Sequence, residues 1–190
     1  MNPRLFALSL VCVSFLATSH SSAQDRAARR GLWGSAIVGY GAATAGCRAP
    51  CPGLGRTLGQ SVVARIGGTA RPNLLLGGEI SGWFQHAKGQ DDVANGSFVA
   101  LFYPSSDRGL FVNAGIGIST YLRDGDVYNG TGAGVSIGIG HDFHWTDKMS
   151  LTVTASVLLG YVGRVSGGGT TYANNWRQMA LIFGGGVTIL

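Results

Sequence analysis

Apolar and small polar residues alternate along most of the chain after residue 30. Between Met149 and Tyr161 every second residue is apolar or aromatic, and the residues between them are mainly Ser, Thr and Gly. The segments 110–118 and 133–143 repeat this alternation. A period of two residues predicts β-strands with two unlike faces, and no long segment of this region shows a helical period. The pattern therefore predicts an all-β protein.

The same test predicts eight strands. We expect them at 32–42, 58–70, 74–86, 96–104, 109–122, 132–143, 149–162 and 176–190. The fold expected for residues 31–190 is an eight-stranded antiparallel up-and-down transmembrane β-barrel.

The predicted connections alternate in length. Those at 71–73, 105–108 and 144–148 are short. Those near 43–57, 87–95, 123–131 and 163–175 are longer and rich in Gly, Asn and Asp, and Asn95-Gly96 and Asn129-Gly130 are turn signals where such loops pass into strands. Barrels of the outer membrane have short periplasmic turns and longer outer loops, so both termini are expected on the periplasmic side.

The first residues have the features of a secretory signal. Arg4 precedes an apolar run over 5–17, and Ser21-Ser22-Ala23 resembles a cleavage site. The run is too short for a membrane-spanning helix, which argues against an uncleaved anchor. We therefore expect a cleaved signal peptide over 1–23, a short basic periplasmic leader over 24–30, and the barrel after it.

The polar face of the predicted strands consists of Gly, Ser, Thr and Asn, with few charges. A soluble barrel in the periplasm would also alternate, but its exterior would carry Lys and Glu, whereas this set suits the packed lumen of a small barrel. Aromatic residues collect at the strand ends, where membrane barrels have their interfacial girdles. They are Trp33, Tyr40, Trp83, Phe84, Tyr103, Tyr121, Phe143, Trp145, Tyr161 and Trp176.

The composition of the chain excludes some classes of protein and of binding partner. Removing the signal leaves 13 Lys and Arg residues against 9 Asp and Glu residues, a net charge of +4 that does not suggest nucleic-acid binding. Glycine, at 32 of 190 residues, has no three-residue period, so collagen is excluded. The two cysteines that remain, Cys47 and Cys51, lie in one predicted outer loop and could form a small disulfide in an oxidising compartment.

Arg65 and Glu79 are charged residues on the inward register of neighbouring strands. Each lies seven residues from Pro72 in the predicted turn, so they should face each other across the hairpin inside the lumen. A buried charge needs a partner, so we interpret them as a structural lumen ion pair, with gating or conduction as the alternative.

No catalytic, cofactor-binding or metal-binding residue is predicted. Gly134-Val135-Ser136-Ile137-Gly138 has the spelling of a nucleophile elbow but lies within a strand, where the motif needs a strand–turn–helix. His141 and His144 fall at the periplasmic end, and His86 near the outer end has no Ser partner. Asp124 and Asp126 of one outer loop are too few ligands for calcium.

The chain resembles the small outer-membrane β-barrel proteins of the OmpA/OmpX type. The resemblance covers 31–190 and rests on Gly31-Leu32-Trp33-Gly34, the 72–77 hairpin, Gly115-Ile116-Gly117 and the 183–190 ending. It implies a membrane anchor, a surface for adhesion or host interaction, or a narrow pore. One departure is the last residue, because such barrels commonly end in an aromatic residue and this chain ends in Leu190, with Ile189 expected to face lipid.

We therefore expect a non-enzymatic protein of the bacterial outer membrane, with four surface loops and a structural or surface-interaction role. Its expected partners are outer-membrane lipid, lipopolysaccharide and, during biogenesis, the barrel assembly machinery. The alternatives are a barrel enzyme that modifies membrane lipid and a soluble ligand-binding barrel of the periplasm.

Overall fold

The computed structural model describes residues 31–47, 54–85, 91–105, 108–123 and 127–190. The expected signal peptide and leader, His86, Cys51, Asp124 and Asp126 lie outside these residues. No helix of the described part is long and apolar enough to cross a membrane.

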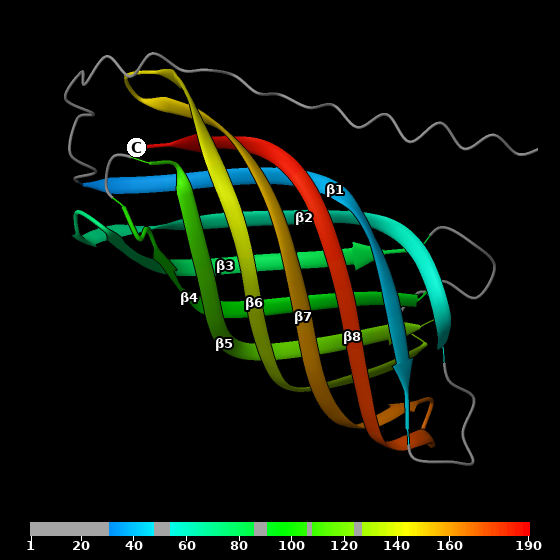
Figure 1. Cartoon of the computed structure of the whole chain (residues 1–190). Helices are drawn as coiled ribbons and strands as arrows, with labels where there is room; N and C mark the ends of the chain where they lie inside the picture. Colours follow the sequence, from blue (N-terminus) through cyan, green and yellow to red (C-terminus); the bar gives the residue numbers. More distant parts are fainter. Residues whose placement is uncertain (1–30, 48–53, 86–90, 106–107, 124–126) are drawn as a thin grey trace, which may run out of the picture.

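Eight antiparallel strands form a closed barrel in which each strand pairs with the next and the last pairs with the first (Figure 1). They are β1 (Leu32–Gly46), β2 (Leu54–Arg71), β3 (Leu74–Phe84), β4 (Asp91–Phe102), β5 (Leu110–Arg123), β6 (Tyr128–Thr146), β7 (Met149–Gly167) and β8 (Thr170–Ile189). The predicted fold and strand order are confirmed. We call the end where β1 begins and β8 ends the periplasmic end, and the opposite end the outer end.

All strands except β3 extend further toward the outer end than the sequence predicted, whereas β3 ends at Phe84 instead of residue 86. Asn95-Gly96 and Asn129-Gly130 lie within the ladders of β4 and β6, so interpreting them as turns was wrong. The predicted long loop at 163–175 was also wrong, because β7 and β8 continue to a tight turn at Gly168 and Gly169. Both glycines have positive φ, as the two central residues of a type I′ hairpin turn require. Polar residues that resemble loops in the sequence therefore belong to strands.

The outward positions of all eight strands are mainly apolar. Val38, Ile66, Ile80, Phe98, Ile116, Ile137, Val153 and Phe183 are among the large exposed side chains. An apolar surface that surrounds a closed barrel is stable against lipid and not against water. This exterior rules out the alternative of a soluble periplasmic barrel.

The aromatic residues at the strand ends lie on two different faces of the barrel wall. Tyr40, Phe143, Trp145 and Tyr161 are outward and exposed, as girdle residues are, and the strand alternation places Phe84 on the same face. The other five are at most 3% exposed and occupy the lumen: Trp33, Trp83, Tyr103, Tyr121 and Trp176. Assigning all ten to the girdles was therefore wrong. The position of a residue along its strand determines its depth in the membrane, whereas its register determines whether it faces the lipid or the lumen.

The last strand closes the barrel in the expected orientation. Ile189 is outward and pairs with Gly34 of β1 and with Met149 of β7. The Leu190 backbone N–H donates to the Lys148 carbonyl at 3.0 Å, and the Leu190 side chain packs against the buried cluster at the periplasmic end. The terminal leucine thus packs inward, while Ile189 supplies the lipid-facing surface.

Glycines on the inward register make the narrow lumen possible. A Cβ on Gly140 would overlap the Phe111 ring, and a Cβ on Gly59 would overlap the indole of Trp83. At Gly67 the neighbouring backbone comes so close that a Cβ would lie 2.6 Å from the Gly77 Cα. Large and small inward residues are therefore complementary across the barrel.

We predict that Gly67→Ala destabilises the barrel by about 1–3 kcal/mol, because the methyl group overpacks a contact between two backbones. Gly78→Ala is the matched control, since it lies in the same hairpin and a Cβ there meets nothing within 4 Å. The measurement is urea unfolding in lipid vesicles, followed by tryptophan fluorescence. Equal unfolding free energies for the two variants would contradict the prediction.

Candidate functional site: the layered lumen and outer mouth

The lumen is divided into three layers along the barrel. The periplasmic seal is the buried cluster of Trp33, Leu75, Val99, Leu101, Tyr103 and Phe111. The outer plug is the buried cluster of Ala43, Ala45, Trp83, Val93, Tyr121, Leu158, Val162, Val165, Ala173, Trp176, Ala180 and Ile182. Between them lies a central polar layer that contains Arg65 and Glu79. Each layer is built by alternate residues of several strands.

Arg65 and Glu79 meet in the central layer. They are directly paired between β2 and β3, and Arg65 Nε lies 2.7 Å from Glu79 Oε2. Their side chains are only 1% and 2% exposed. Ser35 of β1 pairs with Arg65 and Ser97 of β4 pairs with Glu79, so hydroxyl groups flank the ion pair on both sides. The structure thus brings together the two residues that the sequence placed opposite each other.

Many polar atoms of the central layer have no protein partner among the described residues. They include Arg65 Nη1, both amide atoms of Asn113 and the hydroxyl groups of Ser35, Ser61, Ser81, Ser97, Ser136 and Ser156. Others form a short chain, in which Gln178 Nε2 donates to Ser119 Oγ at 2.7 Å and Ser119 donates to the Asn95 amide oxygen. Buried polar groups without protein partners are normally satisfied by ordered water. The central layer is therefore suited to hold water between two apolar seals.

Asp142 organises the periplasmic end of the lumen. Its carboxylate accepts hydrogen bonds from the Tyr103 hydroxyl at 2.8 Å and from Thr152 Oγ1 at 2.7 Å. Thr152 Oγ1 also lies 2.7 Å from Thr188 Oγ1 of β8. The Tyr103 ring in turn packs against Phe111, with 5.3 Å between the centroids. One carboxylate therefore joins the β4–β5 connection to β6, β7 and β8.

The outer plug is held by contacts between indole and phenol groups. Trp83 Nε1 donates to the Gly41 carbonyl at 3.1 Å, which fixes the indole across the lumen. The rings of Tyr121 and Trp176 are 4.7 Å apart, and the Tyr121 hydroxyl donates to the Asp91 carboxylate. Three strands thus supply the centre of the plug, and β4 anchors it.

Arg123 lies above this plug at the outer mouth. Its Nη1 donates to the Tyr172 hydroxyl at 2.6 Å, and its Nε is 4.0 Å from Asp91 Oδ1. Tyr172 also packs against Tyr128, with 5.1 Å between centroids, and against Trp176, with 6.0 Å. This group of charged and aromatic residues joins the outer ends of β4, β5, β6 and β8.

Sequence reasoning missed both the outer mouth and Asp142. Asp91, Tyr128 and Tyr172 fell in segments that were predicted to be loops, so no register was assigned to them. Asp142 did lie on the inward face of a predicted strand, as Glu79 did, and its charge in that position was the available signal. Arg123 directly follows a predicted strand, and extending that strand by one residue would have included it.

The remaining predicted residues do not assemble a catalytic site. Ser136 is fully buried in an unbroken strand, where it pairs with Gly115 and Leu158. The sequence around it therefore does not form the sharp turn of a nucleophile elbow. The His141 ring packs against Phe143 on the outer face, with 4.4 Å between centroids. The described residues contain no group of three His, Cys, Asp or Glu side chains that could hold a metal ion.

The predicted disulfide falls partly outside the described residues. Cys47 is disulfide-bonded and packs against the outer plug. Its expected partner Cys51 is not among the described residues, so the pairing stays a prediction.

Comparison with known proteins identifies the fold. No family model and no curated protein sequence matches the chain. Neisserial surface protein A (NspA) has a similar structure, with a TM-score of 0.53 and 15% identity over 84% of this chain and 96% of that one. Ail of Yersinia pestis, solved with the heparin analogue sucrose octasulfate, has a TM-score of 0.53 and 11% identity over 83% of this chain and 99% of that one. The fold is that of the small eight-stranded outer-membrane β-barrels.

We predict that Arg65 and Glu79 are energetically coupled. Arg65→Met or Glu79→Gln alone should cost about 3–5 kcal/mol, because each leaves a buried charge without its partner. The double variant should lose clearly less than the sum of the two losses, as measured by urea unfolding in lipid vesicles. Arg65→Met combined with Arg108→Gln, an exposed residue of the periplasmic end, is the control and should be additive. Additivity of the Arg65 and Glu79 losses within about 0.5 kcal/mol would show that the pair is not coupled.

Proposed function

We propose that this outer-membrane barrel is a non-enzymatic, non-conducting surface protein. In this proposal the barrel is the membrane anchor, and its outer hairpins are the part that meets other molecules. The observation that carries the proposal is the pair of apolar seals at the two ends of the lumen.

The seals favour a closed barrel over a pore. Trp83, Tyr121 and Trp176 of the outer plug and Tyr103 of the periplasmic seal have no exposed surface. An ion would have to pass both clusters as well as the Arg65–Glu79 pair. Small barrels of eight strands are filled by their own side chains, and this lumen agrees with that rule.

The position of the polar groups argues against an enzyme that acts on lipid. Such an enzyme needs a nucleophile, a base and a carboxylate that open toward the membrane or the outer surface. Ser136 is inside the lumen, and His141 is on the outer face toward the periplasmic end. These groups therefore lie on opposite sides of the barrel wall.

The outer ends of the strands favour a surface role. β7 and β8 pair up to Gly167 and Thr170, just beyond Val165 and Ala173 of the outer plug, and form a hairpin with a polar, exposed tip. The ionic and aromatic contacts of Asp91, Arg123 and Tyr172 tie the strands together beneath it. A rigid base that carries projecting hairpins is the arrangement on which binding surfaces are commonly built.

We predict that the purified protein does not conduct ions in planar lipid bilayers. Replacing Trp83 or Trp33 alone with alanine should also give no channels, because the two seals act in series. The combined Trp33→Ala/Trp83→Ala variant should give measurable conductance. Heat-modifiable gel migration checks that each variant is folded, and a general porin in the same bilayer is the positive control. Ohmic conductance of the unmodified barrel would overturn the non-conducting assignment.

We also predict that the protein leaves membrane lipid chemically unchanged. Mass spectra of lipid A from cells with and without expression should be identical, as should those of cells that express the Ser136→Ala variant. Loss of an acyl chain that depends on the unmodified protein and disappears in Ser136→Ala would establish the enzymatic alternative.

A further inference from the structure

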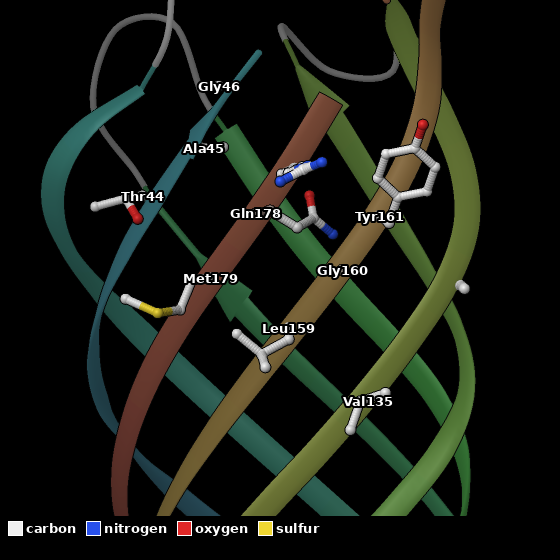
Figure 2. Close-up of a pocket in the computed structure, with 11 residues that line it drawn as sticks. Thr44, Ala45, Gly46, Val135, Leu159, Gly160, Tyr161, Gln178 and Met179 are labelled. Carbon is white, nitrogen blue, oxygen red and sulfur yellow. The ribbon is translucent and has the colours of Figure 1, made fainter. Parts of the chain in front are cut away.

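A groove of about 770 Å³ lies on the outer wall of the barrel near its outer end (Figure 2). It crosses four adjacent strands, β6, β7, β8 and β1, so it spans the seam where the barrel closes. Its volume is within the range of about 300–1,000 Å³ that is usual for sites of small ligands.

Two rows of outward side chains form the groove. The upper row, nearer the outer end, is Gly46, Arg177, Tyr161 and Ala133, and the lower row is Thr44, Met179, Leu159 and Val135. In each row the four residues are direct cross-strand partners. The lower row is mainly apolar, whereas the upper row has a cation and a phenol between two small residues.

The groove is amphipathic along the barrel axis. Below it the wall continues with Leu181, Val157 and Ile137, which are cross-strand partners in the next outward row. In the upper row of the groove the Arg177 guanidinium lies over the Tyr161 ring, 5.7 Å from the centroid. The Tyr161 hydroxyl donates to the Asn175 amide oxygen at 3.0 Å. Aromatic and cationic residues at this position mark the boundary between hydrocarbon and head groups.

Among the described residues of the four strands, the charged side chains near the groove are cationic. The strands β1, β7 and β8 contain no Asp or Glu, and the only acidic residue of β6 is Asp142, at the periplasmic end and inside the lumen. Arg177 is exposed, and Arg164 is exposed three residues beyond Tyr161 in β7. No carboxylate partner of either arginine occurs among the described residues. An anion at the upper rim would therefore meet the Arg177 guanidinium, and no acidic residue of these four strands lies beside it.

We propose that this groove binds one molecule of lipopolysaccharide from the outer leaflet. Arg177 contacts a phosphate of its lipid A, and an acyl chain lies over Met179, Leu159 and Val135. The proposal deepens the proposed function, on which it rests for the orientation of the barrel, because it names one partner of the surface.

Three features of the groove favour lipopolysaccharide as its ligand. The groove opens sideways from an apolar wall, so its ligand reaches it from the membrane rather than from water. It lies at the outer end, where a bound lipid belongs to the outer leaflet. Its apolar lower row and cationic upper rim match an acyl chain that ends in a phosphorylated head group.

The test is native mass spectrometry of the detergent-solubilised barrel, titrated with purified lipid A. We expect one retained lipid A molecule per barrel. Arg177→Gln should weaken binding roughly tenfold, the size of one charge-assisted hydrogen bond. Arg71→Gln removes an exposed arginine at the periplasmic end and is the matched control, which should bind like the unmodified protein.

A second pair of variants tests the space in the groove without changing its charge. Ala133→Phe fills the upper row and should also weaken binding at least tenfold. Ala114→Phe places the same ring at an exposed alanine of β5, on another part of the wall, and should have no effect. Heat-modifiable migration shows whether each variant is folded.

Lipids of other chemistry complete the test. Dephosphorylated lipid A should bind at least tenfold more weakly, and phosphatidylglycerol should not compete at equal concentration. Equal binding by all four variants, or equal competition by phosphatidylglycerol, would overturn the proposal. This outcome is separable from the proposed function, because a barrel that conducts ions could still bind lipid A, and a sealed barrel could fail to bind it.

Discussion

The lumen of an eight-stranded barrel is only wide enough for its own side chains, and this constraint acts on every inward position. Where Phe111 or Trp83 fills the space, the facing residue is a glycine, Gly140 or Gly59. Where the chain places Arg65 and Glu79 inside, their side chains form a contact at 2.7 Å. The exterior is free of this constraint and only has to be apolar. The inward face of each strand is therefore limited by the space in the lumen, whereas the outward face is limited only by its contact with lipid.

The inward residues have different roles in the three layers of the lumen. The apolar layers at the two ends exclude solvent, and the polar layer between them contains the Arg65–Glu79 pair and its serine neighbours. A fully apolar lumen would be simpler, and replacing buried ion pairs with apolar groups is often neutral for stability. An ion pair between β2 and β3, however, is satisfied in only one register of that hairpin. The contact between Arg65 and Glu79 agrees with the observed register of β2 and β3.

Alternation in the sequence was enough to predict the fold, the strand order and the Arg65–Glu79 pairing, because these depend on local period and on the position of one turn. It was not enough to separate girdle aromatics from lumen aromatics. Trp176 begins the predicted strand 176–190 but lies within the observed β8, and its register, shared with the buried Gln178, shows that it faces the lumen. The outer mouth was missed for another reason. Near the outer ends of the strands polar residues occur on both faces, as at the buried Asp91 and its neighbour Asp92, so the apolar–polar alternation by which strands are detected is lost there.

The pairing of β1 with β8 has a consequence for how the protein is made. The other seven pairings join neighbours in the sequence and can form as local hairpins, whereas Gly34 and Ile189 are at opposite ends of the barrel sequence. Contacts of such long range are slow to form, because most of the chain must be ordered first. Closure must therefore wait until the whole chain has been synthesised and exported. Until then the edges of β1 and β8 are open to pairing with other chains, and unpaired strand edges of this kind favour aggregation.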